Sequence, residues 1–103
     1  MKHQVVIVGG GAAGLAAAAS LLKRKRDLDI AVIEPKEEHY YQPGWTMVGG
    51  GVFDYAVTVR PESMVMPKGV TWIRQAAKAF EPDANAVVLD DGARVEYDFL
   101  VAA

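Results

Sequence analysis

The chain has 103 residues, a net charge of −2 and no cysteine. This length fits one compact domain and leaves no room for two. The acidic and basic residues nearly balance, so the chain has no excess of basic residues for binding nucleic acid, and we expect no nucleic-acid partner. Without cysteine, the chain has no disulfide framework, no thiolate metal site and no thiol nucleophile of its own.

The uncharged stretch at residues 5–22 has two competing interpretations, a membrane or signal helix and a strand followed by a helix. Four glycines inside it oppose the first, because each costs a helix roughly 1 kcal/mol relative to alanine. Residues 5–8 are β-branched and end in glycine, which predicts a strand buried on both faces of a parallel sheet. Residues 12–26 are rich in alanine and leucine and predict a helix.

A second strand is expected at residues 29–34, where Pro35 ends it because proline cannot continue a central ladder. Strand, helix and strand then form a right-handed βαβ unit. Residues 35–68 show little periodicity, with one short helix expected after Pro61. A long irregular stretch in a small domain is typically functional.

The C-terminal part predicts further strands. Residues 70–73 form a third strand, and residues 76–80 are expected to extend its pairing. Residues 86–89 and 93–97 flank Asp90, Asp91 and Gly92, and the Asp-Gly pair favours a hairpin turn. Residues 99–103 resemble another buried strand in which the chain stops, so we expect a truncated piece of a longer protein. The predicted sheet order is third, second, first, last.

The glycine-rich turn after the first strand carries the main functional signal. Residues 9–14 match G-x-G-x-x-G, in which each glycine has its own role. Gly9 permits a tight turn, Gly11 lets phosphate oxygens approach the backbone, and Gly14 lets the helix pack closely on the strand. The amides of Gly11, Ala12 and Ala13 are then expected to face a pyrophosphate.

Glu34 lies twenty residues after Gly14, at the end of the second strand. A carboxylate there accepts hydrogen bonds from ribose hydroxyls, and it argues against a 2′-phosphate by charge repulsion. Pro35 and Lys36 are included in the candidate cofactor site beside it. A solvent-exposed strand end is the alternative interpretation of Glu34.

Residues 39–45 form an aromatic loop that could wall a planar ring. His39 is not expected to bind a metal, because His3 is the only other histidine, and we predict no metal site.

The sequence resembles sulfide:quinone oxidoreductases, which are flavoproteins of the class with two dinucleotide-binding domains. The stretches that carry the resemblance are residues 39–51, 67–73 and 97–103. It implies a three-layer, Rossmann-like α/β fold with a parallel sheet and a small antiparallel excursion. It also implies that residues 1–103 are the N-terminal portion of one FAD-binding domain.

The resemblance further implies that Ala76 and Ala77 border the adenine, that Gln42 and Pro43 lie toward the isoalloxazine, and that Ala103 begins a segment closing over the flavin. No catalytic side chain is expected in this chain. The intact enzyme would oxidise sulfide and pass electrons through FAD to quinone, and it would meet the membrane surface peripherally, through parts outside this sequence. We expect cytoplasmic synthesis, a homodimer, and a fragment that is inactive alone.

Two alternatives stay open at this stage. One is an NAD(P)H-dependent flavoprotein reductase similar to type II NADH dehydrogenases, which share the glycine loop and the ending at residues 97–101. The other is a non-catalytic nucleotide-binding module.

Overall fold

One sheet organises the part of the chain that the computed structural model describes, residues 1–40 and 59–103. The sheet has six strands in the order β5-β2-β1-β8-β7-β6. β1, β2, β5 and β8 pair in parallel, which confirms the predicted order of third, second, first and last strand. The strands are β1 (Lys2–Val8), β2 (Ile30–Ile33), β5 (Val70–Ile73), β6 (Ala77–Glu81), β7 (Ala86–Leu89) and β8 (Arg94–Ala102).

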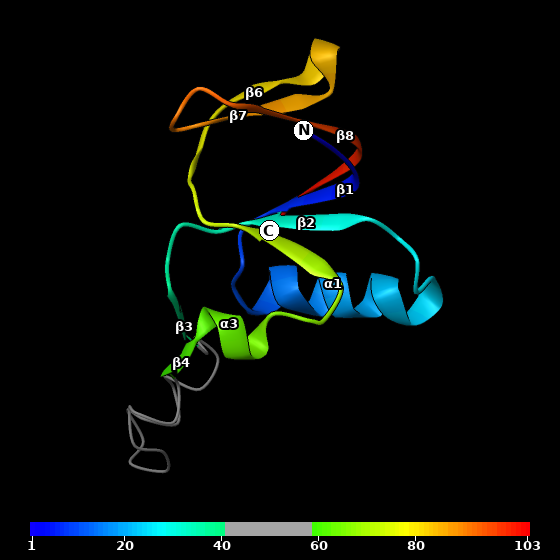
Figure 1. Ribbon diagram of the computed structural model, residues 1–103, viewed down its shortest axis with the longest axis vertical. Helices are drawn as coiled ribbons and strands as arrows, with labels where there is room; N and C mark the ends of the chain where they lie inside the picture. The colour runs from blue at the N-terminus through cyan, green and yellow to red at the C-terminus, as the bar shows by residue number, and fades with distance from the viewer. Residues whose placement is uncertain (41–58) are drawn as a thin grey trace.

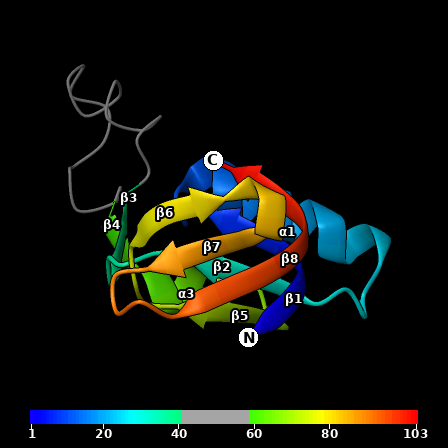
Figure 2. The ribbon, with the colours of Figure 1, turned by 90° about the horizontal axis from the view of Figure 1, so that it is seen from above.

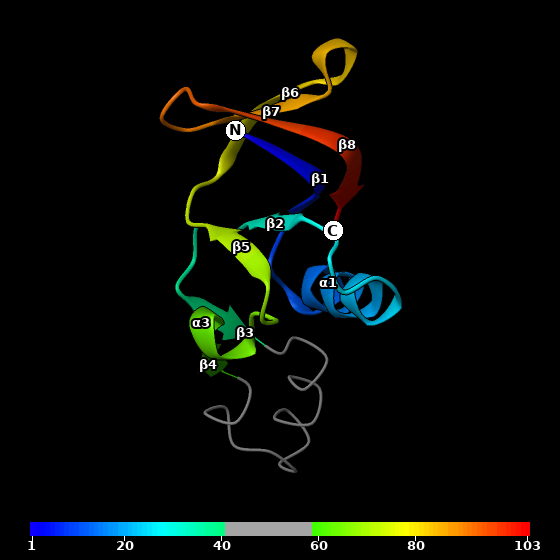
Figure 3. The same ribbon diagram turned by 45° about the vertical axis from the view of Figure 1, so that its right-hand side comes forward.

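The remaining elements are short apart from one helix. Helix α1 (Ala12–Arg24) follows β1, and the short helix expected after Pro61 is α3 (Glu62–Val65). A small antiparallel pair, β3 (Glu38–Tyr40) and β4 (Val59–Pro61), lies beside α3 (Figure 3). A 3-10 turn, Pro82–Ala84, joins β6 to β7. Within the described stretches, no helix has the length and apolarity needed to cross a bilayer.

The fold has three layers, with the parallel strands in the middle. Alternate side chains of β1 point to opposite faces of the sheet, as the two-residue period of a strand requires. Val5 and Ile7 pack under α1 with Ala18, whereas Val6 packs on the other face. Figures 1 and 2 show α1 against one face and the antiparallel strands β6 and β7 over the other. The core on that second face comprises Val6, Ala31, Ile33, Ile73, Val87, Leu89, Val95 and Tyr97.

Two sequence predictions for the C-terminal part were wrong in detail. Residues 93–97 and 99–103 are not separate strands, because β8 runs through both. Its first residues pair antiparallel with β7, and Glu96–Ala102 pair in parallel with β1. Residues 76–80 do not extend β5, because β6 pairs antiparallel with β7 instead. The excursion is therefore continuous with the main sheet.

The last part of β8 is also less buried than predicted. β7 reaches β8 only as far as Glu96, so beyond that point β8 pairs with β1 alone among the described residues. Phe99 lies opposite Val5 in the register and is 70% exposed. Predicted burial fails here because a strand is buried only when neighbours cover it, which strand composition does not report.

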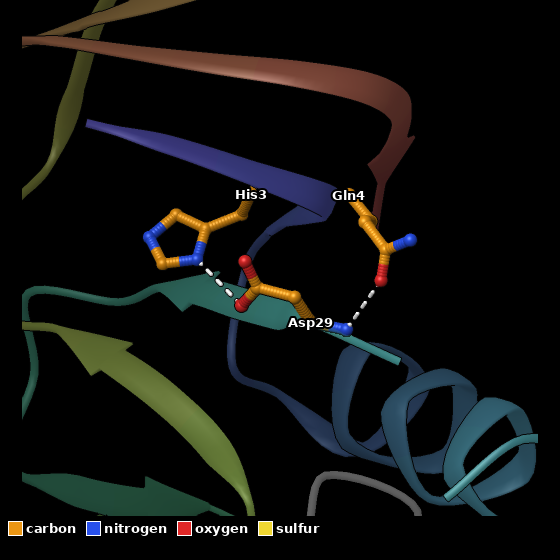
Figure 4. A network of polar contacts seen from close by, with 3 residues as sticks. All are labelled: His3, Gln4 and Asp29. Atoms are coloured by element: carbon orange, nitrogen blue, oxygen red, sulfur yellow. Dashed lines mark hydrogen bonds and ion pairs between the residues drawn. The ribbon is translucent and has the colours of Figure 1, made fainter. Parts of the chain in front are cut away.

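The amino-terminal ends of β1 and β2 are held together by side chains (Figure 4). His3 Nδ1 lies 2.8 Å from Asp29 Oδ1, and the Asp29 N–H donates to Gln4 Oε1 at 2.9 Å. Asp29 was expected inside the second strand, but β2 begins at Ile30. These bonds lie at the end of the sheet opposite the glycine turn, and they help to fix the register of β1 on β2.

The predicted hairpin turn is present between β7 and β8. Gly92 has φ +85, as this turn requires, and its N–H donates to Leu89 O at 2.9 Å. Asp91 Oδ1 accepts from the Ala93 N–H at 2.9 Å, and Asp91 Oδ2 accepts from Gln75 Nε2 at 3.0 Å. The hydrogen bond from Ala93, and next that from Gln75, lower the pKa of Asp91 because they stabilise the carboxylate.

A lowered folded-state pKa means that Asp91 stabilises the fold only while it is ionised. We expect wild type to exceed Asp91→Asn in unfolding free energy at neutral pH. The difference should shrink as the pH falls below about 4, where an unfolded aspartate takes up its proton. Denaturant unfolding of both proteins across this range measures it.

Asp90→Asn is the matched control for this experiment. It removes the same charge one position earlier, from a side chain that makes no hydrogen bond to the described residues. A gap between wild type and Asp91→Asn that stayed constant down to the lowest pH would contradict the assigned role.

Candidate functional site

The turn between β1 and α1 leaves the sheet at its centre, where β1 lies between β2 and β8. Gly9 has φ +110, a backbone conformation that residues with a side chain rarely adopt. Its N–H donates to Ile33 O at 2.9 Å, while the Ala103 N–H donates to Val8 O at 3.0 Å. A Cβ on Gly9 would lie 2.9 Å from Ala103 O. The turn is thus bonded to both neighbouring strands and has no space for a side chain at Gly9.

Gly14 and Gly11 face opposite surroundings. A Cβ on Gly14 would collide with the carbonyl oxygen of Gly9, so α1 lies directly against the turn. A Cβ on Gly11 would meet nothing within 4 Å among the described residues, and the φ of −75 at Gly11 suits any residue. The fold therefore requires glycine at position 14 but not at position 11.

The first turn of α1 presents its backbone amides without competition from side chains. Gly11 is the N-cap, it makes no side-chain cap, and the first turn contains no acidic residue. Helix N-termini carry unsatisfied N–H groups and a partial positive charge, which together attract phosphate. Ala12 and Ala13 supply small side chains at this end, so an anion can approach the backbone closely.

Glu34 lies immediately beside this turn. Its Oε1 accepts from the Gly10 N–H at 3.0 Å, and its Oε2 accepts from the backbone N–H of Lys36 at 3.1 Å. Each carboxylate oxygen has more than one acceptor position, so both can still accept from a ligand hydroxyl. The carboxylate is therefore oriented by two backbone donors.

A second carboxyl group lies behind the turn. Glu62 opens α3 and is 1% exposed. A Cβ on Gly10 would lie 2.7 Å from Glu62 Oε1 and 2.9 Å from Cβ and Cγ of Glu34. The two glutamates therefore fill the space beside Gly10, which only glycine leaves open. Glu62 was not among the predicted site residues, because an acid directly after Pro61 is typical of an exposed first helical turn.

The other predicted site residues are more scattered. Pro35 is exposed just after β2, and Ala103 is hydrogen-bonded beside Gly9. Ala76 and Ala77 lie where the chain has left β5, and Ala77 packs against the core. Gln42 and Pro43 lie outside the described residues. Among the described residues, no group of three or more His, Cys, Asp or Glu could hold a metal.

Comparisons with known proteins identify a family and several relatives. Residues 3–103 match the model of the family described as pyridine nucleotide-disulphide oxidoreductase. The mitochondrial sulfide:quinone oxidoreductase of Dictyostelium discoideum is 46% identical over 81 residues, which are 79% of this chain and 18% of that protein. The enzyme of the same name from Mus musculus is 39% identical over 75 residues, 73% of this chain and 17% of that protein. The chain thus spans about a fifth of the length of these relatives.

Solved structures show the same fold. The sulfide:quinone oxidoreductase of Aquifex aeolicus matches with a TM-score of 0.84 and 31% identity, over 97% of this chain and 24% of that one. The NADH:rubredoxin oxidoreductase of Clostridium acetobutylicum matches at 22% identity with a TM-score of 0.75, over 99% of this chain and 27% of that one. The second match supports the fold alone.

These matches confirm the resemblance to sulfide:quinone oxidoreductases, the Rossmann-like α/β fold and the assignment to the FAD-binding oxidoreductases. The chain belongs to the pyridine nucleotide-disulphide oxidoreductase family.

Proposed function

We propose that this chain is the adenosine-binding and pyrophosphate-binding part of an FAD-dependent sulfide:quinone oxidoreductase. The observation that carries the proposal is the open position at Gly11, at the uncapped start of α1 and next to the oriented carboxylate of Glu34. Phosphate and ribose recognition are thereby combined within one turn. The identity to sulfide:quinone oxidoreductases of three organisms supports this choice of enzyme.

The described residues fit the adenosine half of FAD. The amides of Gly11, Ala12 and Ala13 bind the pyrophosphate, and Glu34 accepts hydrogen bonds from the ribose hydroxyls. Pro35 and Lys36 border the ribose, and the backbone of Ala76 and Ala77 borders the adenine. FAD, when bound, supplies the two-electron chemistry, and the residues of this chain hold and orient it.

The flavin side of the site belongs to the same proposal. Ala103 begins the segment that covers the isoalloxazine. Because this chain supplies no reacting side chain in the proposal, a protein ending at residue 103 is inactive. It binds FAD weakly because it lacks most of the flavin side of the site.

The substrates are supported by the names of the relatives, and the location is part of the proposal. Sulfide is the electron donor and quinone the acceptor, and their reaction takes place at a membrane surface that the protein meets peripherally. The proposal also includes synthesis in the cytoplasm and a homodimeric state. An NAD(P)H-dependent reductase of the same class is the competing activity.

The choice between these activities is tested on the full-length protein, purified anaerobically with its flavin. Sulfide is expected to bleach the flavin absorbance within the mixing time, and NADH is expected to leave it unchanged. Re-oxidation by a short-chain quinone should then restore the spectrum. Bleaching by NADH and not by sulfide would replace the proposal with the reductase, and protein without any flavin would favour a non-catalytic module.

The glycines of the turn give a matched pair of variants. We expect Gly11→Ala to leave the unfolding free energy of the apoprotein unchanged within about 0.5 kcal/mol, because the added methyl meets no described residue. FAD affinity should fall about tenfold or more, since the methyl occupies the space that a phosphate oxygen needs. Denaturant unfolding and FAD titration measure the two effects separately.

Gly14→Ala is the contrasting variant. Its Cβ would collide with Gly9 O, so we expect destabilisation of about 1–3 kcal/mol despite the better helix propensity of alanine. If Gly11→Ala bound FAD as tightly as wild type, the proposed position of the pyrophosphate would be wrong.

A further inference from the structure

The backbone of Glu34 is fixed by β5 through two hydrogen bonds of different kinds. Its N–H donates to Ile73 O at 3.0 Å, which continues the parallel pairing of β2 with β5 for one residue. Its carbonyl oxygen accepts from the indole Nε1–H of Trp72, also at 3.0 Å. The second bond comes from a side chain, so it depends on the identity of residue 72 and not on the fold alone.

The bond from Trp72 to the Glu34 carbonyl lies where the regular pairing of β2 ends. Pro35 follows Glu34, has no N–H and cannot continue the ladder, so regular pairing stops here. The carbonyl of Glu34 is the first backbone group beyond the last regular hydrogen bond between β2 and β5. Its direction sets the path of the chain toward Lys36. Lys36 in turn donates its backbone N–H to Glu34 Oε2. Holding this carbonyl therefore helps to hold the donor that orients the carboxylate.

The indole ring of Trp72 is itself covered by the side chain of Arg74. The guanidinium carbon of Arg74 lies 4.3 Å from the centroid of the indole ring, within the range of a cation–π contact. Arg74 Nη1 lies 3.8 Å from Glu37 Oε1, three residues beyond Glu34. The indole is partly buried, and its only hydrogen-bond donor is the N–H that Glu34 accepts. The side chains of Glu37, Arg74 and Trp72 thus form a connected series that ends on the backbone carbonyl of Glu34.

We propose that Trp72 is a positioning residue for ribose recognition, and that it acts through the carbonyl of Glu34 on the carboxylate that binds the ribose hydroxyls. Arg74 supports it by fixing the plane of the indole. The inference rests on the proposed nucleotide site and goes beyond it, because neither residue touches the ligand in that proposal. The ligand class is a nucleotide with both ribose hydroxyls free.

The test uses the flavin-free, full-length protein and calorimetric titration with ADP and with 2′,3′-dideoxy-ADP. Trp72→Phe keeps an aromatic ring but removes the N–H. We expect its affinity for ADP to fall about fivefold, the effect of losing one hydrogen bond, while its affinity for the dideoxy nucleotide changes less than about twofold. The preference for ribose hydroxyls therefore decreases.

Ile73→Val is the matched control on the same strand. It removes a core methylene but leaves every side-chain hydrogen bond to Glu34 in place. We expect it to lower stability and to keep the wild-type ratio of the two affinities. Arg74→Gln, which retains the indole N–H, should lower the ratio by a smaller factor than Trp72→Phe and serves as the test if Trp72→Phe does not fold.

The outcomes separate this inference from the proposal on which it rests. Equal losses for ADP and the dideoxy nucleotide in Trp72→Phe, or an unchanged ratio in Arg74→Gln where Trp72→Phe does not fold, would overturn the positioning role and leave the nucleotide site intact. Failure of the wild-type protein to bind ADP and FAD would overturn the nucleotide site, and the role of Trp72 with it.

Discussion

The close contact between α1 and the end of β1 is the constraint on which the rest of the structure depends. Gly14 lies so near the carbonyl of Gly9 that any side chain at position 14 would collide with it. This contact places the start of α1 over the central strand and allows Leu15 and Ala18 to be buried. Without this contact, α1 could not cover Val5 and Ile7. The first turn of α1 would then not lie at the end of the sheet where Glu34 lies.

The candidate site is assembled from segments that are far apart in the sequence. Gly10 follows β1, Glu34 follows β2, Glu62 opens α3 and Trp72 lies in β5. Parallel strands bring their carboxyl ends to one edge, and that geometry is what gathers these residues. A single carboxylate then accepts from two backbone donors, so its orientation is set before any ligand arrives. Such preorganisation lowers the entropic cost of binding.

The sequence predicted the elements whose signals are local. Residues 70–73 are a strand and Gly92 lies in a turn, because β-branched runs and Asp-Gly pairs act within a few positions. The glycine turn and Glu34 were predicted because their spacing repeats a known physical arrangement. These positions are the ones that the proposed function assigns to phosphate and ribose binding.

The features that were missed depend on distant neighbours. Glu62 is buried because α3 packs beside the turn at Gly10, 52 positions earlier in the chain. The bond from Trp72 to Glu34 spans 38 positions, and tryptophan in a strand predicts only packing. The exposure of Phe99 reflects which strand lies beside β8. Contacts between distant segments, not composition, decide each of these.

The pairing of β1 with β8 has a consequence for biosynthesis. Lys2 lies opposite Glu96 and Val8 opposite Ala102, so the central strand acquires its second neighbour only after almost all 103 residues have been made. Contacts between such distant positions carry a high loop-closure cost and slow folding. Until β8 emerges from the ribosome, β1 is an edge strand rich in valine and isoleucine. The nascent chain therefore passes through a period in which the apolar half of β1, residues 5–8, is open to pairing with other chains.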